Sequence, residues 1–291
     1  MIKSEGIATV CKQYKTNGIS ECSTESTYEP IENYEAGYAP VDHSVIENYV
    51  IKNTVYDLPL AQCKVYTVTN ESSEKFILKV IEKDGLSQMM TAKAREECVI
   101  QSQLQHENIA KLHHYSETPT TIELVMEHCN QYSYFEERLE ENSDPIEDGV
   151  KLKKYVTEIL RALEYIHSKG IVHADIKLAN ICLHKDSDGE ETIKLIDFGL
   201  SLVTNAQNNG KAYMKSPIGT LGYMAPEIKG KDIIVGPEID MWAFGIVLYK
   251  MCVGYTPTQV PHFSYGNGPI PFVKRDWRKL DSNLQDLISK C

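Results

Sequence analysis

The stretch IVHADIKLANICL, residues 171–183, places an acid, an amine and an amide close together. Apolar residues precede and follow this polar block, so we expect two short buried strands with a loop between them. Asp175 in that loop can orient a hydroxyl group or accept its proton, and Asn180 can supply an oxygen ligand to a metal ion. This combination suits the attack of a hydroxyl group on a charged, metal-bound group.

Residues elsewhere in the chain extend this chemistry toward phosphoryl transfer. Lys79 lies in a predicted strand, FILKV, and can hold phosphate oxygens. Glu97 in the next predicted helix can fix that lysine by an ion pair, with Glu96 as the alternative partner. Asp197, in LIDFGL, supplies a carboxylate at a strand end, where the glycine of the same motif permits a sharp turn. Phosphoryl transfer requires mainly positioning, bound metal ions and charge neutralisation, and these residues can provide all three.

Two kinds of segment must position these residues. From Tyr49 to Glu127, β-rich runs separated by turn residues predict a small antiparallel sheet, interrupted by one helix in SQMMTAKAREECVIQSQL. After Pro145 the chain becomes mostly helical. VKLKKYVTEILRALEYIHSKG has one apolar face and ends at Gly170, whereas DMWAFGIVLYKMCVG is apolar nearly all round and predicts a buried helix. The predicted fold class is therefore α+β, with a β-rich small lobe followed by a helical large lobe.

The composition is that of an ordinary globular protein, with 42% hydrophobic and 24% charged residues. The length of 291 residues favours one large domain with two lobes, or two domains. A net charge of −11 argues against nucleic acid as the main partner. No apolar run approaches the roughly 20 residues needed for a membrane span. The acidic residues of DSDGEET imitate a calcium loop, but the position of the glycine favours a tight hairpin.

The ends of the chain and its cysteines bear on location. Residues 1–45 are rich in Ser, Thr, Glu and Tyr without helical or strand periodicity, so we expect a flexible N-terminal extension. The N-terminus lacks the continuous apolar core of a secretory signal. The eight cysteines are scattered and form no Cys-x-x-Cys pair. Reduced thiols in a cytoplasmic or nuclear protein are the expected interpretation.

Three motifs in a fixed order resemble the eukaryotic protein kinase domain family over about residues 49–291. They are His173-x-Asp175-x-x-x-x-Asn180, Asp197-Phe198-Gly199 and Ala225-Pro226-Glu227. The resemblance implies a two-lobed, protein kinase-like fold. Residues 1–45 would be an extension, 46–129 the N-lobe and hinge, and 130–291 a C-lobe that ends before the last helix of the family.

The resemblance also implies roles for the residues that carry the chemistry. Asp175 would accept or orient the substrate hydroxyl, and Lys177 would neutralise the migrating phosphoryl group. Lys79, paired with Glu97, would hold the phosphates of ATP. Asn180 and Asp197 would bind Mg²⁺. Asp240 would brace the catalytic loop, and His173 and Phe198 would pack in a hydrophobic column.

The nucleotide-binding residues follow from the same resemblance. Backbone groups of Glu127 and Cys129 would bind adenine at the hinge. Lys177, together with Thr220 in GTLGYMAPE, resembles the serine/threonine class more than the tyrosine class. A protein substrate, ATP and Mg²⁺ are therefore expected, with a regulatory partner left open. The residues expected to contact the nucleotide are Leu58, Val65, Ile77, Lys79, Met126, Glu127, Cys129 and Cys182.

Several positions depart from the family pattern. Leu58, Leu60 and Cys63 stand where three glycines are usual in the phosphate-binding loop, which should reshape phosphate binding and stiffen the loop. Ile77 replaces a small residue above adenine. Ala174 replaces an arginine that receives an activation-loop phosphate in most members, so activity should depend less on that phosphate.

These departures leave alternatives beside an active protein serine/threonine kinase. The chain could be a pseudokinase, a nucleotide-binding or scaffolding module with little transfer, or it could transfer phosphate to something other than a protein. The complete set of lysine, glutamate, base and metal ligands favours an active kinase, because a scaffold has no physical need for all of them. Fold alone would not decide between these functions.

Overall fold

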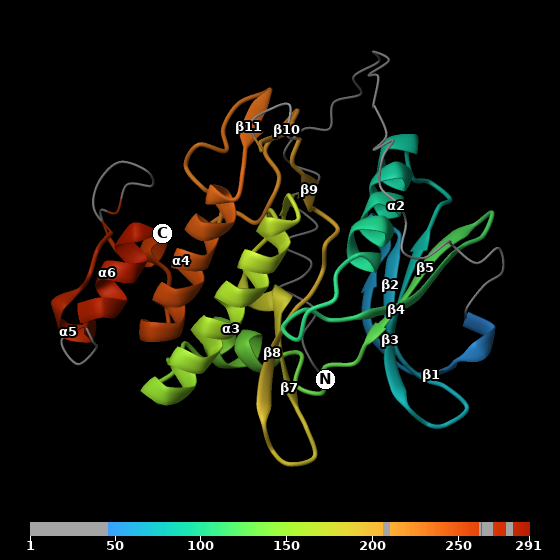
Figure 1. The fold of residues 1–291 in the computed structure, drawn as a ribbon, viewed down its shortest axis with the longest axis horizontal. Helices are drawn as coiled ribbons and strands as arrows, with labels where there is room; N and C mark the ends of the chain where they lie inside the picture. Colours follow the sequence, from blue (N-terminus) through green and yellow to red (C-terminus); the bar gives the residue numbers. More distant parts are fainter. Residues whose placement is uncertain (1–45, 206–209, 262, 264–269, 278–281) are drawn as a thin grey trace. The chain divides into compact units, whose positions relative to one another are not determined.

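The computed structural model describes residues 46–205, 210–261, 263, 270–277 and 282–291, so the predicted extension at 1–45 lies outside the described residues. The chain divides into two compact units (Figure 1). Of the described residues, the first unit contains those of 46–103 and 112–128, and the second contains those of 104–111 and 129–291. The predicted α+β class is confirmed, because the first unit holds a five-stranded antiparallel sheet and the second is mainly helical.

The first unit is built on a five-stranded antiparallel sheet in the order β1-β2-β3-β5-β4. Side chains alternate between the two faces of the central strand, β3. On one face Leu78 and Val80 pack with Val68 of β2, and on the other Ile81 packs against a helix. The strands are β1 (Val50–Leu58), β2 (Cys63–Thr69), β3 (Lys75–Glu82), β4 (Leu112–Glu117) and β5 (Thr121–Glu127).

Helix α2 (Gln88–Ser102) lies against this sheet (Figure 1). It begins at Ser87, whose hydroxyl accepts a hydrogen bond from the Met90 N–H at 3.2 Å and caps the helix. Ala94 and Cys98 are one helical turn apart and pack into an apolar cluster with Leu124 of β5. The helix is therefore anchored to the sheet by its C-terminal half.

The second unit is mainly helical. Helix α3 (Gly149–Ser168) is capped by the Asp148 carboxylate and ends before Gly170, which has a φ of +71°. Helix α4 (Glu238–Val253) is buried along nearly its whole length, as its composition predicts, and ends at Gly254. The helices α5 (Lys274–Trp277) and α6 (Ser282–Lys290) complete the helical part.

Short strand pairs in the second unit carry the loops with chemistry. The segment predicted as a hairpin forms one, in which β7 (Ile181–Lys185) pairs with β8 (Glu191–Leu195). The other pairs are β6 (Ile171–Val172) with β9 (Leu202–Val203) and β10 (Ala212–Met214) with β11 (Ile233–Val235). Residues 104–111 join this unit because their backbone bonds to β8: the Leu195 N–H donates to the Asn108 carbonyl at 2.9 Å and the Ala110 N–H donates to the Leu195 carbonyl at 3.0 Å.

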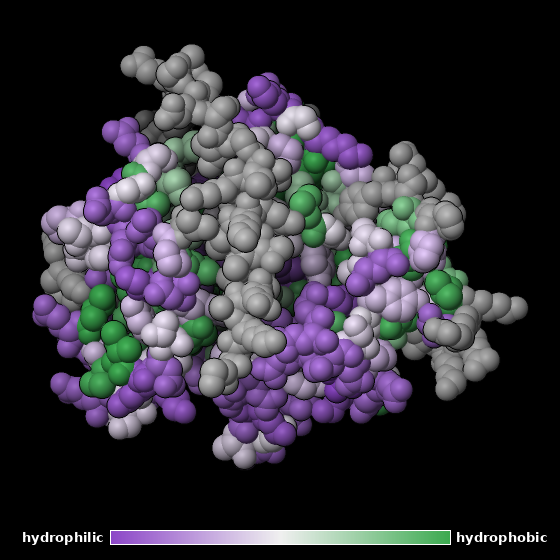
Figure 2. Space-filling model, turned by 180° about the vertical axis from the view of Figure 1, so that it is seen from behind, coloured by the Kyte–Doolittle hydropathy of each residue, from purple (hydrophilic) through white to green (hydrophobic). Residues whose placement is uncertain are grey.

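Among the described residues on the face shown in Figure 2, hydrophilic residues cover more of the surface than hydrophobic ones. Among the described residues, no helix combines the length and the apolar composition that a membrane crossing requires.

Candidate active site

The strand lysine and the helix glutamate of the first unit form a buried ion pair. Lys79 Nζ lies 2.6 Å from Glu97 Oε1, and the two side chains are 15% and 4% exposed. Glu96 instead pairs with Lys93 on its own helix at 2.6 Å. The alternative that the sequence left open is thus resolved in favour of Glu97.

The nucleotide-binding candidates of the first unit share one face of the sheet, except Glu127, which lies opposite Phe76 and so projects to the other face. In the strand register, Val65 lies opposite Lys79 and Ile77 lies opposite Met126. Leu58 lies opposite Cys63, two residues from Val65, and so projects to the same side. The Lys79 ammonium therefore lies beside a half-buried apolar surface.

The connection between β1 and β2 takes a tight turn without glycine. Residues 59–61 form one 3-10 turn, and Gln62 follows in the left-handed region with a φ of +51°. The turn is closed by the Gln62 N–H, which donates to the Pro59 carbonyl at 3.2 Å, and by the Glu82 N–H, which donates to the Gln62 carbonyl at 2.8 Å. The side chain of Leu60, one of the expected departures from glycine, lies outside the described part. Gln62 thus adopts a backbone conformation that glycine adopts at lower cost.

We expect Gln62→Gly to be more stable than Gln62→Ala by about 1 kcal/mol, because alanine keeps the strained Cβ and glycine does not. Both variants lose the same side chain beyond Cβ, so their difference isolates the backbone strain. Urea denaturation of the two proteins measures it. Equal stability would mean that the turn is not strained by its side chain.

In the second unit, a buried carboxylate organises the loop that follows β6. Asp240, in the first turn of α4, is 1% exposed. It accepts hydrogen bonds from the backbone N–H groups of His173 and Ala174, each at 2.8 Å, and lies 2.8 Å from His167 Nε2. The rings of His173 and Phe198 pack 4.9 Å apart. Helix α4 therefore fixes the backbone immediately before Asp175.

Asp175 is surrounded by hydrogen-bond donors from two segments of the chain. Lys177 Nζ donates to Asp175 Oδ2 at 2.7 Å, and Thr220 Oγ1 donates to Oδ1 at 2.6 Å. Lys177 Nζ also donates to Thr220 Oγ1 at 2.9 Å, which closes a three-residue network. The carboxylate is 7% exposed, so these charge-assisted bonds fix its orientation. The sequence assigned Asp175 and Lys177 to the site and used Thr220 only as a sign of the serine/threonine class, and the structure brings all three together.

The two metal-ligand candidates lie at the same end of the β7–β8 hairpin. Asn180 Nδ2 donates to the Asp175 carbonyl at 2.9 Å and to Asp175 Oδ2 at 3.1 Å, which directs its amide oxygen away from that carboxylate. The Ile196 N–H donates to the Asn180 carbonyl at 3.0 Å, and Asp197 follows with an exposed side chain and a φ of +62°. In the described residues, no group of three or more His, Cys, Asp and Glu could hold a metal ion. A carboxylate and an amide oxygen nevertheless fit Mg²⁺, because this ion takes few protein ligands when phosphates supply others.

Two cysteines expected to contact the nucleotide lie in the second unit. Cys129 and Cys182 are 3% and 2% exposed. A hydrogen bond with Cys129 and burial raise the pKa of the Cys182 thiol, so that thiol is neutral. Both side chains are thus almost fully buried, and their contact with the nucleotide stays a prediction.

Ala174 contacts an apolar cluster in place of the cation that is usual at this position. It has a φ of +63° and is 8% exposed. Residues of both strands of the β10–β11 pair contribute to the cluster, and so does Ala225 after Thr220. Apolar packing and strand pairing therefore hold the segment between Asp197 and Glu227 at this point.

The sequence analysis did not identify a polar network behind the loop that carries Thr220. Lys250, a buried residue in the last turn of α4, pairs with Glu140, whose other oxygen accepts a hydrogen bond from the Tyr223 hydroxyl at 2.6 Å. Burial, followed by the charge of Glu140, raises the pKa of Tyr223 well above its usual value, so the phenol remains a donor. Lys250 ends a long apolar run of this helix, and that position could have indicated the network, since a buried lysine requires a charged or polar partner.

The chain is similar in sequence to several proteins that are named as protein kinases. The human calcium/calmodulin-dependent protein kinase type IV is 33% identical over 233 residues, which is 78% of this chain and 46% of that protein. The mouse serine/threonine-protein kinase DCLK3 is 31% identical over 229 residues, 75% of this chain and 27% of that protein. Calcium-dependent protein kinase 5 of Plasmodium falciparum is 28% identical over 301 residues, 96% of this chain and 50% of that protein.

The chain thus spans half the length of these curated relatives or less. The family model for the protein kinase domain matches residues 61–291, which include every motif residue of the site described above. With that match and that arrangement of residues, the chain belongs to the protein kinase domain family.

Proposed function

We propose that this chain is an ATP-dependent protein serine/threonine kinase, which transfers the γ-phosphoryl group of ATP to a serine or threonine hydroxyl. The observation that carries the proposal is the network of Asp175, Lys177 and Thr220, in which a buried carboxylate is held by an amine and a hydroxyl. The curated relatives named above are themselves named as kinases, two of them by their dependence on calcium or calmodulin. The dependence on calcium or calmodulin is a property of those relatives and is not part of the proposal for this chain.

In the proposed reaction, each residue has one physical task. Asp175 orients the attacking hydroxyl and accepts its proton, while Lys177 neutralises charge on the group in transfer. Lys79, held by Glu97, binds phosphate oxygens. Mg²⁺, held by Asn180 and Asp197, would supply the charge neutralisation that phosphates require. Val65 and Ile77, on the half-buried apolar face of the first unit, would contact adenine.

The experiment that tests this function is transfer of labelled γ-phosphate from Mg²⁺-ATP to a library of serine- and threonine-containing peptides. Labelled phosphoserine or phosphothreonine is the expected product, and it should be absent from the Asp175→Asn protein. A thermal shift with Mg²⁺-ATP separates the alternative, because a ligand that binds the native state raises the melting temperature. Stabilisation without transfer to any peptide would support a pseudokinase and overturn the proposal.

We further propose that activity depends little on phosphorylation of the segment that contains Ser216. Ser216 is exposed and lies two residues after the β10 strand, whose residues Ala212 and Met214 belong to the apolar cluster around Ala174. Ser216→Ala should therefore reduce the rate only a few-fold, because strand pairing and apolar contacts hold the segment without a phosphate. The rate with one peptide substrate, compared between the two proteins, measures this. Complete loss in the variant would mean that a phosphate-binding pocket holds the segment instead.

A further inference from the structure

The first part of helix α2 lacks the buried side chains that normally fix a helix on a sheet. No residue of 88–93 is buried, and Met89 and Met90 are 67% and 41% exposed. Apolar packing begins only at Ala94 and continues through Cys98. Apolar packing therefore holds α2 only from Ala94 onward, and the half of the helix before Glu97 contributes little that opposes its rotation.

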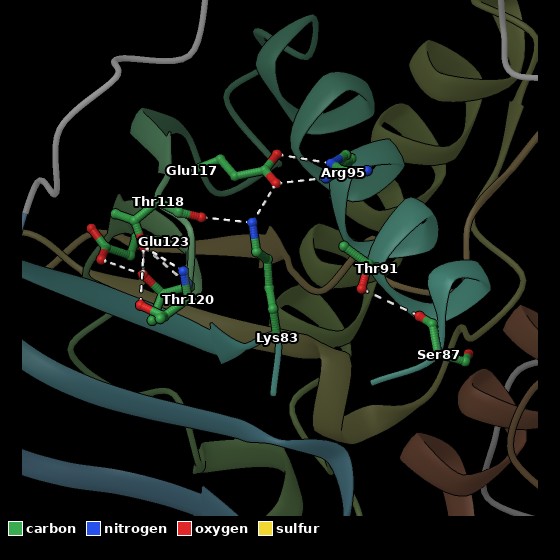
Figure 3. Close-up of polar contacts among 9 residues, drawn as sticks. Lys83, Ser87, Thr91, Arg95, Glu117, Thr118, Thr120 and Glu123 are labelled. Atoms are coloured by element: carbon green, nitrogen blue, oxygen red, sulfur yellow. Dashed lines mark hydrogen bonds and ion pairs between the residues drawn. The ribbon is translucent and has the colours of Figure 1, made fainter. Parts of the chain in front are cut away.

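A second ion pair ties the helix to the sheet at this point (Figure 3). Arg95 bonds to Glu117 at the end of β4 through two parallel contacts, Nε to Oε2 at 2.8 Å and Nη2 to Oε1 at 2.7 Å. A paired contact of this kind fixes both the distance and the orientation of the two groups. It therefore constrains the helix more than a single contact would.

Glu117 is itself held in place by a second cation, Lys83 (Figure 3). Lys83, the residue directly after β3, donates to Glu117 Oε1 at 2.8 Å and to the Thr118 carbonyl at 2.6 Å. The hydrogen bonds from Arg95, with those from Lys83, lower the pKa of Glu117 to about 2. The Glu117 carboxylate is consequently charged at every pH at which the protein would be assayed, so it can accept hydrogen bonds from Arg95 throughout that range.

The positions of Arg95 and Glu97 on α2 explain how the contact between Arg95 and Glu117 can affect Glu97. Two residues along an α-helix are separated by about 200° around its axis, so the two side chains leave on nearly opposite sides. Glu97 points to Lys79, and Arg95 reaches to Glu117. Rotation of α2 in either direction would break one of the two pairs, so each pair constrains the other.

We propose that Glu117 is a positioning residue, which sets the rotation of α2 through Arg95 and thereby holds Glu97 against Lys79. Its catalytic consequence rests on the proposed kinase function. Arg95 is 53% exposed, and exposed ion pairs contribute little to overall stability. The expected signature is thus a loss of helix position and of activity that exceeds the loss of stability.

Cys98 reports the helix position without any need for activity. Its thiol is 1% exposed in the cluster under α2, and burial raises its pKa, so alkylation is slow while the helix stays in place. We expect Glu117→Gln and Arg95→Gln each to increase the alkylation rate of Cys98 by iodoacetamide about tenfold, measured peptide by peptide in a mass spectrometer. The kcat for a peptide substrate should fall by about tenfold in both, with Arg95→Lys in between.

A matched control exists in the same sheet. Lys64 and Glu82 form an equally short ion pair, 2.6 Å, between β2 and β3, so Glu82→Gln removes a comparable contact that does not touch α2. That variant should leave Cys98 alkylation and kcat unchanged. Alkylation of Cys182, buried in the other unit, detects general unfolding and should stay constant in every variant.

The double variant Arg95→Gln with Glu117→Gln should behave like Glu117→Gln alone, because that variant already removes the carboxylate that holds Arg95. Unchanged Cys98 alkylation in Glu117→Gln, or additive effects in the double variant, would overturn the proposal. The alkylation result holds whether or not the protein transfers phosphate, so a failure of the kinase assignment would be seen separately, as absence of transfer by the wild-type chain.

Discussion

Replacement of Asp175 by asparagine is expected to lower the rate of phosphoryl transfer by about 10²- to 10⁴-fold, the usual contribution of a positioned base. The affinity for Mg²⁺-ATP should stay nearly unchanged, since Asp175 acts on the hydroxyl and is not assigned to the nucleotide. A steady-state rate with a peptide substrate and a thermal titration with Mg²⁺-ATP measure the two effects separately.

The contacts of Asp175 explain why its carboxylate has no good substitute. Its two oxygens accept hydrogen bonds from Lys177 and Thr220, and Asn180 donates to the same side chain. An asparagine has only one oxygen, so its amide N–H₂ would face at least one donor. Thr220→Val is the appropriate control, because it removes a donor and keeps the carboxylate. If Asp175→Asn weakened ATP binding as much as turnover, the assignment of Asp175 as the base would be wrong.

The local features of the fold could be predicted because they depend on residues near one another in the chain. The apolar composition of α4 predicted its burial, and Gly170 predicted the end of α3. The order of the motifs predicted that Asp175, Lys177 and Asn180 would lie in one loop. For these residues a short spacing implies proximity, so sequence alone was sufficient.

The features that the sequence did not predict depend on contacts between distant residues. Glu140 and Lys250 are 110 residues apart, and Arg95 and Glu117 are 22 apart. No periodicity relates such pairs, because each is determined by how separate elements pack. The left-handed conformation of Gln62 was also missed, since it follows from the register of β1 and β2 and not from the residue type.

Asp240→Asn is expected to reduce the free energy of unfolding by about 3–5 kcal/mol, the usual cost of removing one charge from a buried, paired network. Asp240 Oδ1 accepts from the Ala174 N–H and Oδ2 from the His173 N–H. Asparagine can accept only one of these bonds, and its own N–H₂ would then face the other N–H with no partner for either. Urea denaturation of the whole chain measures this loss.

His167→Gln provides the comparison for that variant, because it removes the imidazole from Asp240 and leaves both backbone contacts in place. It should cost only about 1 kcal/mol, the usual contribution of a single hydrogen bond. The difference between the two variants measures what the backbone contacts contribute. Ala174 has a φ of +63°, a conformation that costs an alanine about 1–2 kcal/mol, so the loop before Asp175 requires this external support. Equal destabilisation by the two variants would show that Asp240 acts mainly on His167, and that the loop keeps its strained conformation by other contacts.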